Sequence, residues 1–135
     1  MKKTKIFLLV VFVSAVFGLS AGEHVYLCRK CAITVVQERR PSSANCTATG
    51  SHQWNDLGDA GENIYFCRKC RKLVMTRTRP YSANCLSSGS HNWICLGKKG
   101  KNSYQCGKCR LYIRVENRPS ATDCPAGGSH TWNKF

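Results

Sequence analysis

The stretch Cys28-Arg29-Lys30-Cys31, followed by Cys46 and His52, decides the fold, because the chain repeats it twice more without a gap. A shift of 39 residues superimposes the first copy on a second and the second on a third. Each copy also keeps a tyrosine before the cysteine pair, an Arg-Pro step, a Gly-Ser-His run and a tryptophan after the histidine. Self-similarity at a fixed period is the sequence signature of a tandem-repeat architecture.

Three cysteines and one histidine recur in every copy with the spacing C-x2-C-x14-C-x5-H. Two cysteines three positions apart can turn inward in a tight knuckle whose backbone N–H groups hydrogen-bond the thiolates, while a distant pair completes a tetrahedron. We therefore predict three centres, each holding one zinc ion. The predicted ligands are Cys28, Cys31, Cys46 and His52; Cys67, Cys70, Cys85 and His91; and Cys106, Cys109, Cys124 and His130.

Disulfide bonds are the main alternative to a metal, since exported cysteine-rich chains are usually disulfide scaffolds. Three cysteines cannot pair within one copy, and a histidine at fixed spacing has no part in a disulfide framework, so the count favours zinc. Another soft metal is the third interpretation. Because four protein ligands close each site, we predict structural zinc; the alternative is that a histidine dissociates and opens its site.

Each copy is shorter than the roughly 40 residues below which a domain rarely folds without a metal, disulfide or partner. We predict a mainly β unit with extended segments at 32–36, 73–76 and 111–115, and with core positions at Val35, Val74 and Ile113. No helical periodicity is present. The recurring tyrosine and tryptophan are expected to cover the metal site as core, the alternative being platforms that stack bases or sugars.

The cysteine knuckle with a distant second ligand pair resembles the zinc-ribbon and treble-clef class of small zinc modules. The resemblance covers the whole of each copy, although five residues separate Cys46 from His52 where zinc ribbons commonly have two. It implies three tandem zinc-ribbon-like repeats with a 39-residue period, at residues 23–58, 62–97 and 101–135. The joining segments, 58–61 and 97–101, pair glycines with polar residues and are expected to be flexible connections.

Residues 1–22 have the pattern of a secretory signal peptide. A basic start precedes a mostly apolar stretch of 14 residues at 6–19, and small residues follow at 20–22. An uncleaved anchor is the alternative, but 14 residues fall short of the roughly 20 that cross a bilayer. We therefore expect an exported protein, periplasmic or secreted, whose mature chain has no membrane span.

The mature chain is strongly basic and its charge is unevenly shared. Without residues 1–22, 18 basic residues stand against 7 acidic ones, a net charge of +11. The copies carry net charges of 0 (residues 23–61), +7 (62–100) and +4 (101–135). This distribution favours an anionic polymer or surface as a partner, although a solvated face is the simpler interpretation. The predicted contacts are Arg68, Lys69, Arg71, Lys72, Arg77 and Arg79.

Cys95 is the tenth cysteine and lies outside the repeated pattern. We interpret it as a buried free thiol, with a Cys95-linked dimer as the alternative. No carboxylate recurs at one position in all three copies, and no histidine except His24 is left to act as a base, so an enzyme is not expected. The sequence predicts a non-enzymatic zinc-binding repeat protein; zinc buffering or a disulfide-stapled secreted protein are the alternatives.

Overall fold

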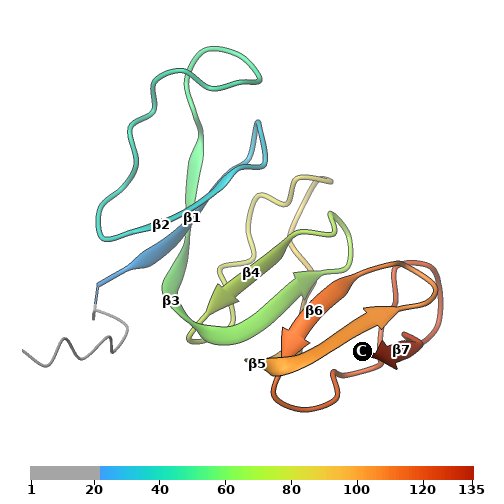
Figure 1. The fold of residues 1–135 in the computed structure, drawn as a ribbon. Helices are drawn as coiled ribbons and strands as arrows, with labels where there is room; N and C mark the ends of the chain where they lie inside the picture. The colour runs from blue at the N-terminus through green and yellow to red at the C-terminus, as the bar shows by residue number, and fades with distance from the viewer. Residues whose placement is uncertain (1–21) are drawn as a thin grey trace, which may run out of the picture.

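The computed structural model describes residues 22–135, so the predicted signal peptide falls almost wholly outside the described residues. Between residues 22 and 135 the chain forms seven strands and no helix, which confirms the prediction of a small, mainly β protein (Figure 1). No helix within this range is long and apolar enough to cross a bilayer. The strands are β1 (His24–Cys28), β2 (Thr34–Gln37), β3 (Trp54–Cys67), β4 (Leu73–Thr76), β5 (Trp93–Cys106), β6 (Tyr112–Val115) and β7 (Trp132–Lys134).

The strands group into three antiparallel units that correspond to the three copies of the repeat. Unit 1 consists of β1, β2 and the first half of β3. Unit 2 consists of the second half of β3, β4 and the first half of β5. Unit 3 consists of the second half of β5, β6 and β7. The long strands β3 and β5 therefore each belong to two units (Figure 1).

The joining segments are not the flexible connections that the sequence suggested. Residues 58–61 lie inside β3 and residues 97–101 lie inside β5. A Cβ atom added to Gly61 would lie 2.3 Å from the backbone nitrogen of Arg77, and one added to Gly100 would lie 2.3 Å from that of Glu116. These glycines permit two backbone segments to cross in contact, so they fix the bend between units instead of loosening it.

The short strands lie where the sequence placed them. The segment predicted at 73–76 is β4, and those predicted at 32–36 and 111–115 contain most of β2 and all of β6. Of the three expected core positions, Val74 is 4% exposed and Ile113 is 3% exposed. Val35 is only half-buried. Unit 1 is thus the least enclosed at this position.

Alternation along the strands gives units 1 and 2 two apolar faces each. The metal face carries the predicted ligands with the recurring tyrosine and tryptophan, as at Tyr26, Cys28 and Trp54 in unit 1. The back face of unit 1 carries Val25 and Leu27 from β1 with Leu57 from β3. The back face of unit 2 carries the equivalent residues, Ile64, Phe66 and Leu96.

The units stack so that each back face covers the metal face of the next unit. Val25 and Leu27 share one buried cluster with Tyr65, Cys67 and Trp93 of unit 2. The back face of unit 2 shares a second cluster with the metal face of unit 3, whose members are Tyr104, Cys106, Ile113, Val115, Cys124 and Trp132. The metal face of unit 1 forms a third cluster from its own residues alone. Among residues 22–135 the units therefore stack in one direction, and no other described unit covers the first metal face.

Candidate metal centres

The first cysteine pair of each unit lies in a knuckle between two strands. In unit 1 the backbone N–H of Cys28 donates to the carbonyl of Ile33 at 3.0 Å, and the N–H of Ala32 donates to the carbonyl of Cys28 at 2.9 Å. Ala32 has a left-handed backbone with φ of 64°. The same two bonds and the same conformation recur around Arg71 and Arg110. The local chain therefore turns both cysteines inward in every unit.

A second turn holds the third cysteine and the histidine. The N–H of Cys46 donates to the carbonyl of Gly50 at 3.0 Å, and Asn45 and Gly50 are both left-handed, with φ of 61° and 56°. Asparagine and glycine tolerate this conformation better than most residues. Equivalent turns close at Cys85 and Cys124. The five residues between the cysteine and the histidine are thus long enough to bring both to one point.

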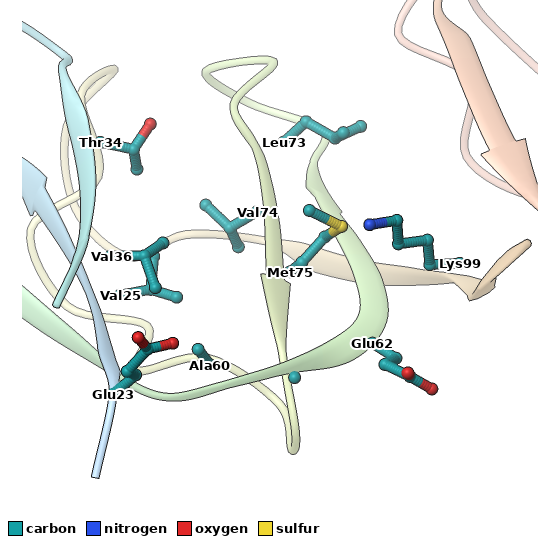
Figure 2. Close-up of a pocket in the computed structure, with 11 residues that line it drawn as sticks. Glu23, Val25, Thr34, Val36, Ala60, Glu62, Leu73, Val74, Met75 and Lys99 are labelled. Atoms are coloured by element: carbon teal, nitrogen blue, oxygen red, sulfur yellow. The ribbon is translucent and has the colours of Figure 1, made fainter. Parts of the chain in front are cut away.

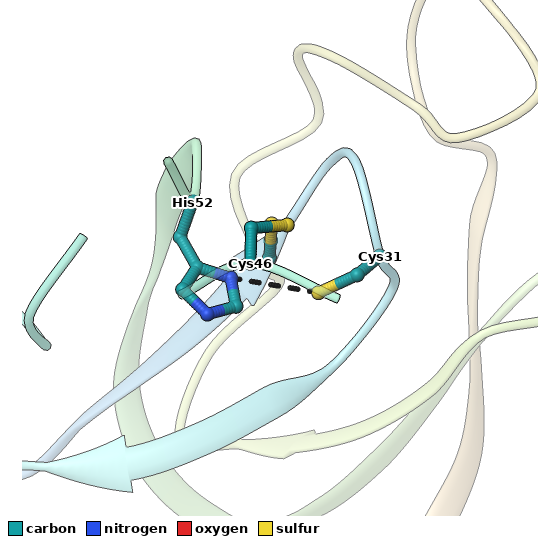
Figure 3. Close-up of side chains that lie close together, drawn as sticks. Cys31, Cys46 and His52 are labelled. Atoms are coloured by element: carbon teal, nitrogen blue, oxygen red, sulfur yellow. Dashed lines mark hydrogen bonds between the residues drawn. The ribbon is translucent and has the colours of Figure 1, made fainter. Parts of the chain in front are cut away.

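The twelve predicted ligands come together as three clusters of three cysteines and one histidine. Within each cluster the ligand atoms all lie within 4.8 Å of one another. The Sγ atom of the second cysteine lies 3.5 Å from the histidine Nδ1 in all three units. Figure 3 shows Cys31, Cys46 and His52 turned toward one another in unit 1. Each of the three clusters can hold a metal ion.

The clusters are arranged for a metal and not for disulfides. The described cysteines are all free. The Sγ atoms of Cys67 and Cys85 are 3.9 Å apart, and those of Cys106 and Cys124 are 4.0 Å apart. A disulfide requires a separation of about 2.0 Å. Nδ1 is the imidazole atom that faces the thiols, so it is the nitrogen that would bind an ion.

The thiols of unit 3 differ sharply in acidity. Burial opposes ionisation of Cys106, but hydrogen bonds from the backbone N–H of Cys109 and from His130 outweigh it and lower the Cys106 pKa to about 5. Burial and the neighbouring Cys106 raise the pKa of Cys109 to about 11. One thiolate therefore forms readily, and a second resists ionisation. A divalent cation supplies the positive charge that lets all three thiols ionise together.

The other two units repeat this pattern. In unit 1, backbone N–H groups and His52 overcome the effect of burial and lower the pKa of Cys28 to about 6. In unit 2, burial and the neighbouring Cys67 raise the pKa of Cys70 to about 12. Burial, with a smaller contribution from the charge of Lys69, lowers the pKa of His91. A lowered pKa favours the neutral imidazole, which is the form that binds metals.

The recurring aromatic residues serve the clusters as core. The tyrosines and tryptophans are 1–9% exposed, too little to act as open stacking platforms. Each tryptophan stacks on its unit's histidine, with ring centroids 4.5–4.7 Å apart. The Trp54 indole N–H donates to the carbonyl of Ser42 at 3.0 Å, and Trp93 and Trp132 make the equivalent bond. The tryptophan thus fixes both the histidine ring and the loop that leads to it.

A lysine that recurs inside the knuckle ties the two ligand loops together. The ammonium group of Lys69 donates to the carbonyls of Ser88 and Ser90 at 2.6 and 3.0 Å. Lys30 and Lys108 donate to the equivalent carbonyls in their own units. Lys69, predicted as an anion contact, thus has a role inside the protein, and the recurrence of this lysine in all three copies is the sequence signal for that role.

Two more of the six predicted anion contacts are engaged within the protein. Lys72 donates to the carbonyl of Ala32 in unit 1 at 2.5 Å. Arg68 forms an ion pair with Asp123 of unit 3, at 3.5 Å. Both therefore join neighbouring units.

The remaining three anion contacts, Arg71, Arg77 and Arg79, are exposed and have no ion pair among the described residues. Arg71 precedes β4, whereas Arg77 and Arg79 follow it. The basic surface is consequently divided between the two ends of this strand.

Cys95 lies on β5 and is exposed, in contrast to the expected buried thiol. It pairs with Tyr65 across the strands. His24 lies near Asp56, with Nδ1 and Oδ2 3.0 Å apart. Neither residue belongs to a metal cluster.

A groove of about 430 Å³ lies between units 1 and 2, away from the clusters. Side chains from β2 and β4 face it, including those of Val36, Val74 and Met75 (Figure 2). None of the twelve predicted ligands lines it.

No protein-family model, curated protein or solved structure matches the chain.

Proposed function

We propose that the chain is an exported, non-enzymatic zinc-binding repeat protein, in which three zinc ions stabilise a stacked β scaffold that binds an anionic partner. The observation that carries the proposal is the triple recurrence of a closed Cys3His cluster. Around tetrahedral zinc, neighbouring sulfur atoms lie about 3.8 Å apart and a sulfur and a nitrogen about 3.6 Å apart. The separations of 3.9, 4.0 and 3.5 Å between ligand atoms match these values.

Thiolate-rich tetrahedral sites favour zinc over magnesium, calcium or manganese, which prefer oxygen ligands. Four protein ligands leave no position for water or substrate, which supports structural ions. We assign the modules to the zinc-ribbon class on the same grounds. Native mass spectrometry of the chain purified with zinc should detect three bound ions. A chain without metal whose cysteines are all oxidised would contradict the proposal and favour the disulfide-stapled alternative.

The anionic partner is proposed from the distribution of charge. Residues 62–100 carry eight basic residues and one acidic residue, whereas residues 23–61 carry four of each. Binding should weaken steeply as salt concentration rises, since counterions released from the polymer drive such complexes. Immobilised heparin is a suitable polyanion probe, and the salt concentration that elutes the protein is the measurement.

The repeat supplies substitutions that the fold tolerates. Unit 1 has Ala32 where unit 2 has Arg71, and units 1 and 3 have glutamate where unit 2 has Arg77. The double variant Arg71→Ala, Arg77→Glu should therefore fold and elute at lower salt. The matched control, Arg29→Ala with Arg39→Glu, makes the same change of net charge in unit 1 and should elute close to the wild type. Equal shifts for both pairs would sink the proposed partner surface.

Zinc buffering is the second candidate, and one observation favours it. His52 is only half-buried, whereas His91 and His130 are each 4% exposed. One centre is thus more accessible than the other two.

A further inference from the structure

The three metal centres differ in what covers them. Other residues of the second and third metal faces share buried clusters with the back face of the preceding unit, and the Nε2 atoms of His91 and His130 are buried without a hydrogen-bond partner. Phe66 of unit 2 approaches the His130 ring edge-on, with centroids 6.4 Å apart. An external molecule can reach these rings only by displacing the apolar residues that cover them.

Within residues 22–135, the first centre has no such cover. The buried cluster around it consists of Tyr26, Cys28, Cys46 and Trp54, with no residue from another unit. His52 is half-buried, whereas His91 and His130 are buried; the second cysteine is half-buried in all three centres. This centre is therefore the one that faces solvent.

The residue that follows the third cysteine differs between the covered centres and the uncovered one. Units 2 and 3 have Leu86 and Pro125, which are partly buried where the preceding unit packs. Unit 1 has Thr47, which is exposed. A polar residue at the uncovered end indicates that water, and not another unit, meets this face.

The opposite end of the stack is more polar than the back faces of units 1 and 2, although Phe135, which stands where unit 1 has Leu57, is exposed. Ser103 and Gln105 of unit 3 stand where unit 1 has Val25 and Leu27. With two of these three positions polar, this back face is poorly suited to cover the metal face of unit 1 in a second molecule in the way that the back faces of units 1 and 2 cover units 2 and 3. The first centre thus stays accessible in a chain that does not polymerise head to tail.

We propose that the first centre is an exchangeable zinc site, which gives up and takes back its ion through external thiolate ligands, while the second and third centres retain theirs. The inference rests on the proposed function, because it requires zinc at all three centres. The His52 imidazole, a neutral ligand at the open edge, gives way, and an incoming thiolate occupies its position. The cysteine thiolates are then exchanged in turn, with no change in oxidation state.

The test is isotope exchange on the full chain loaded with natural zinc. Excess zinc enriched in a heavy isotope is added with glutathione as the external thiolate, and native mass spectrometry follows the replacement of each ion. One ion per chain should exchange at least about tenfold faster than the other two, because groups around the ligands change metal affinity by about this factor or more. Three ions that exchange at a single rate would overturn the inference.

Removal of the first centre assigns the fast ion. The variant Cys31→Ser, His52→Asn should bind two ions, both slow. A fast ion that persists in this variant would place the exchangeable site elsewhere and contradict the inference. Circular dichroism checks that units 2 and 3 remain folded.

Uncovering the second centre tests the cause. Leu27→Gln introduces the residue that unit 3 has at this position, and it should make the second ion exchange about tenfold faster or more. Gln105→Leu is the matched control, because its face covers no centre, and it should leave the pattern unchanged. If Leu27→Gln does not fold, Leu27→Ala serves the same purpose. An unchanged second ion in the folded variant would show that cover does not govern exchange.

The two proposals fail in different ways. A chain that binds no zinc overturns the proposed function. A chain that binds three ions and exchanges them equally overturns only the exchangeable site.

Discussion

Among single residues, the knuckle lysine has the most unexpected role. Its side chain is attached beside the first cysteine pair and bonds the carbonyls that precede the histidine, as Lys69 does at Ser88 and Ser90. A lysine that braces two ligand loops also places positive charge near the thiolates. This accounts for its recurrence in all three copies without any appeal to an external anion.

Lys69→Ala should destabilise the metal-loaded protein by about 1 kcal/mol, because it removes two hydrogen bonds from a charged donor at an exposed site. Thermal unfolding followed by circular dichroism is the measurement. Lys101→Ala is the control, since Lys101 is exposed and makes no side-chain hydrogen bond or ion pair among the described residues. Equal stability of the two variants would show that the brace does not matter.

Recurrence in three copies identified single residues well. The twelve ligands were predicted because metal binding imposes a fixed spacing that can be recognised within one copy. The recurring lysine could be recognised in the sequence, but its hydrogen bonds to the second ligand loop could not. A lysine among arginines is equally consistent with a charged surface. Local spacing specifies ligands; it does not specify the partner of a long flexible side chain.

At the level of elements, the two long strands carry the most information. β3 and β5 each pass through two units and bend where Gly61 and Gly100 meet the backbone of the following short strand. A glycine between polar residues fits both a flexible linker and a close backbone crossing. The sequence alone therefore suggested flexible joints, and the continuous strands became apparent only from the pairing of distant segments.

Gly61→Ala and Gly100→Ala should each destabilise the fold by about 3 kcal/mol, since the added Cβ meets backbone that cannot move aside as a side chain can. Chemical denaturation of the metal-loaded variants measures this. Gly107→Ala is the control, because units 1 and 2 have arginine at that position and its nearest neighbour is a side chain. If Gly61→Ala were as stable as the wild type, the two backbone segments would not be in tight contact at this crossing.

For the whole molecule, stacking makes the centres depend on one another. The ligand Cys67 is part of the apolar cluster that includes Val25 and Leu27, so the second centre and the first back face form a single core. Cys106 links unit 3 to unit 2 in the same way. Which face of one unit meets which face of the next depends on the bend of β3 and β5, so the sequence left open whether the units stack.

Loss of the middle centre should therefore be more damaging than loss of the first. The variant Cys70→Ser, His91→Asn disturbs a core shared by two units, whereas Cys31→Ser, His52→Asn disturbs one unit only. We expect a lower unfolding temperature for the middle variant, measured by circular dichroism with excess zinc. Equal unfolding temperatures would indicate that the units fold independently of one another.

Removal of all metal should unfold the described chain, because each unit is too short to fold on apolar contacts alone. Treatment with a strong chelator should abolish the far-ultraviolet signal of the strands and shift the tryptophan fluorescence toward that of exposed indole. Added zinc should restore both. Retention of the strand signal without metal would contradict this view of the fold.

The shared strands also make the architecture extensible. Residues 62–100 contain a metal face that accepts one neighbour and a back face that covers another, and this segment begins and ends at equivalent points of β3 and β5. Duplicating this segment in frame would lengthen the stack by one unit. The metal face of unit 1 and the back face of unit 3 would remain its two ends. The chain can therefore be lengthened by whole units without the design of any new interface.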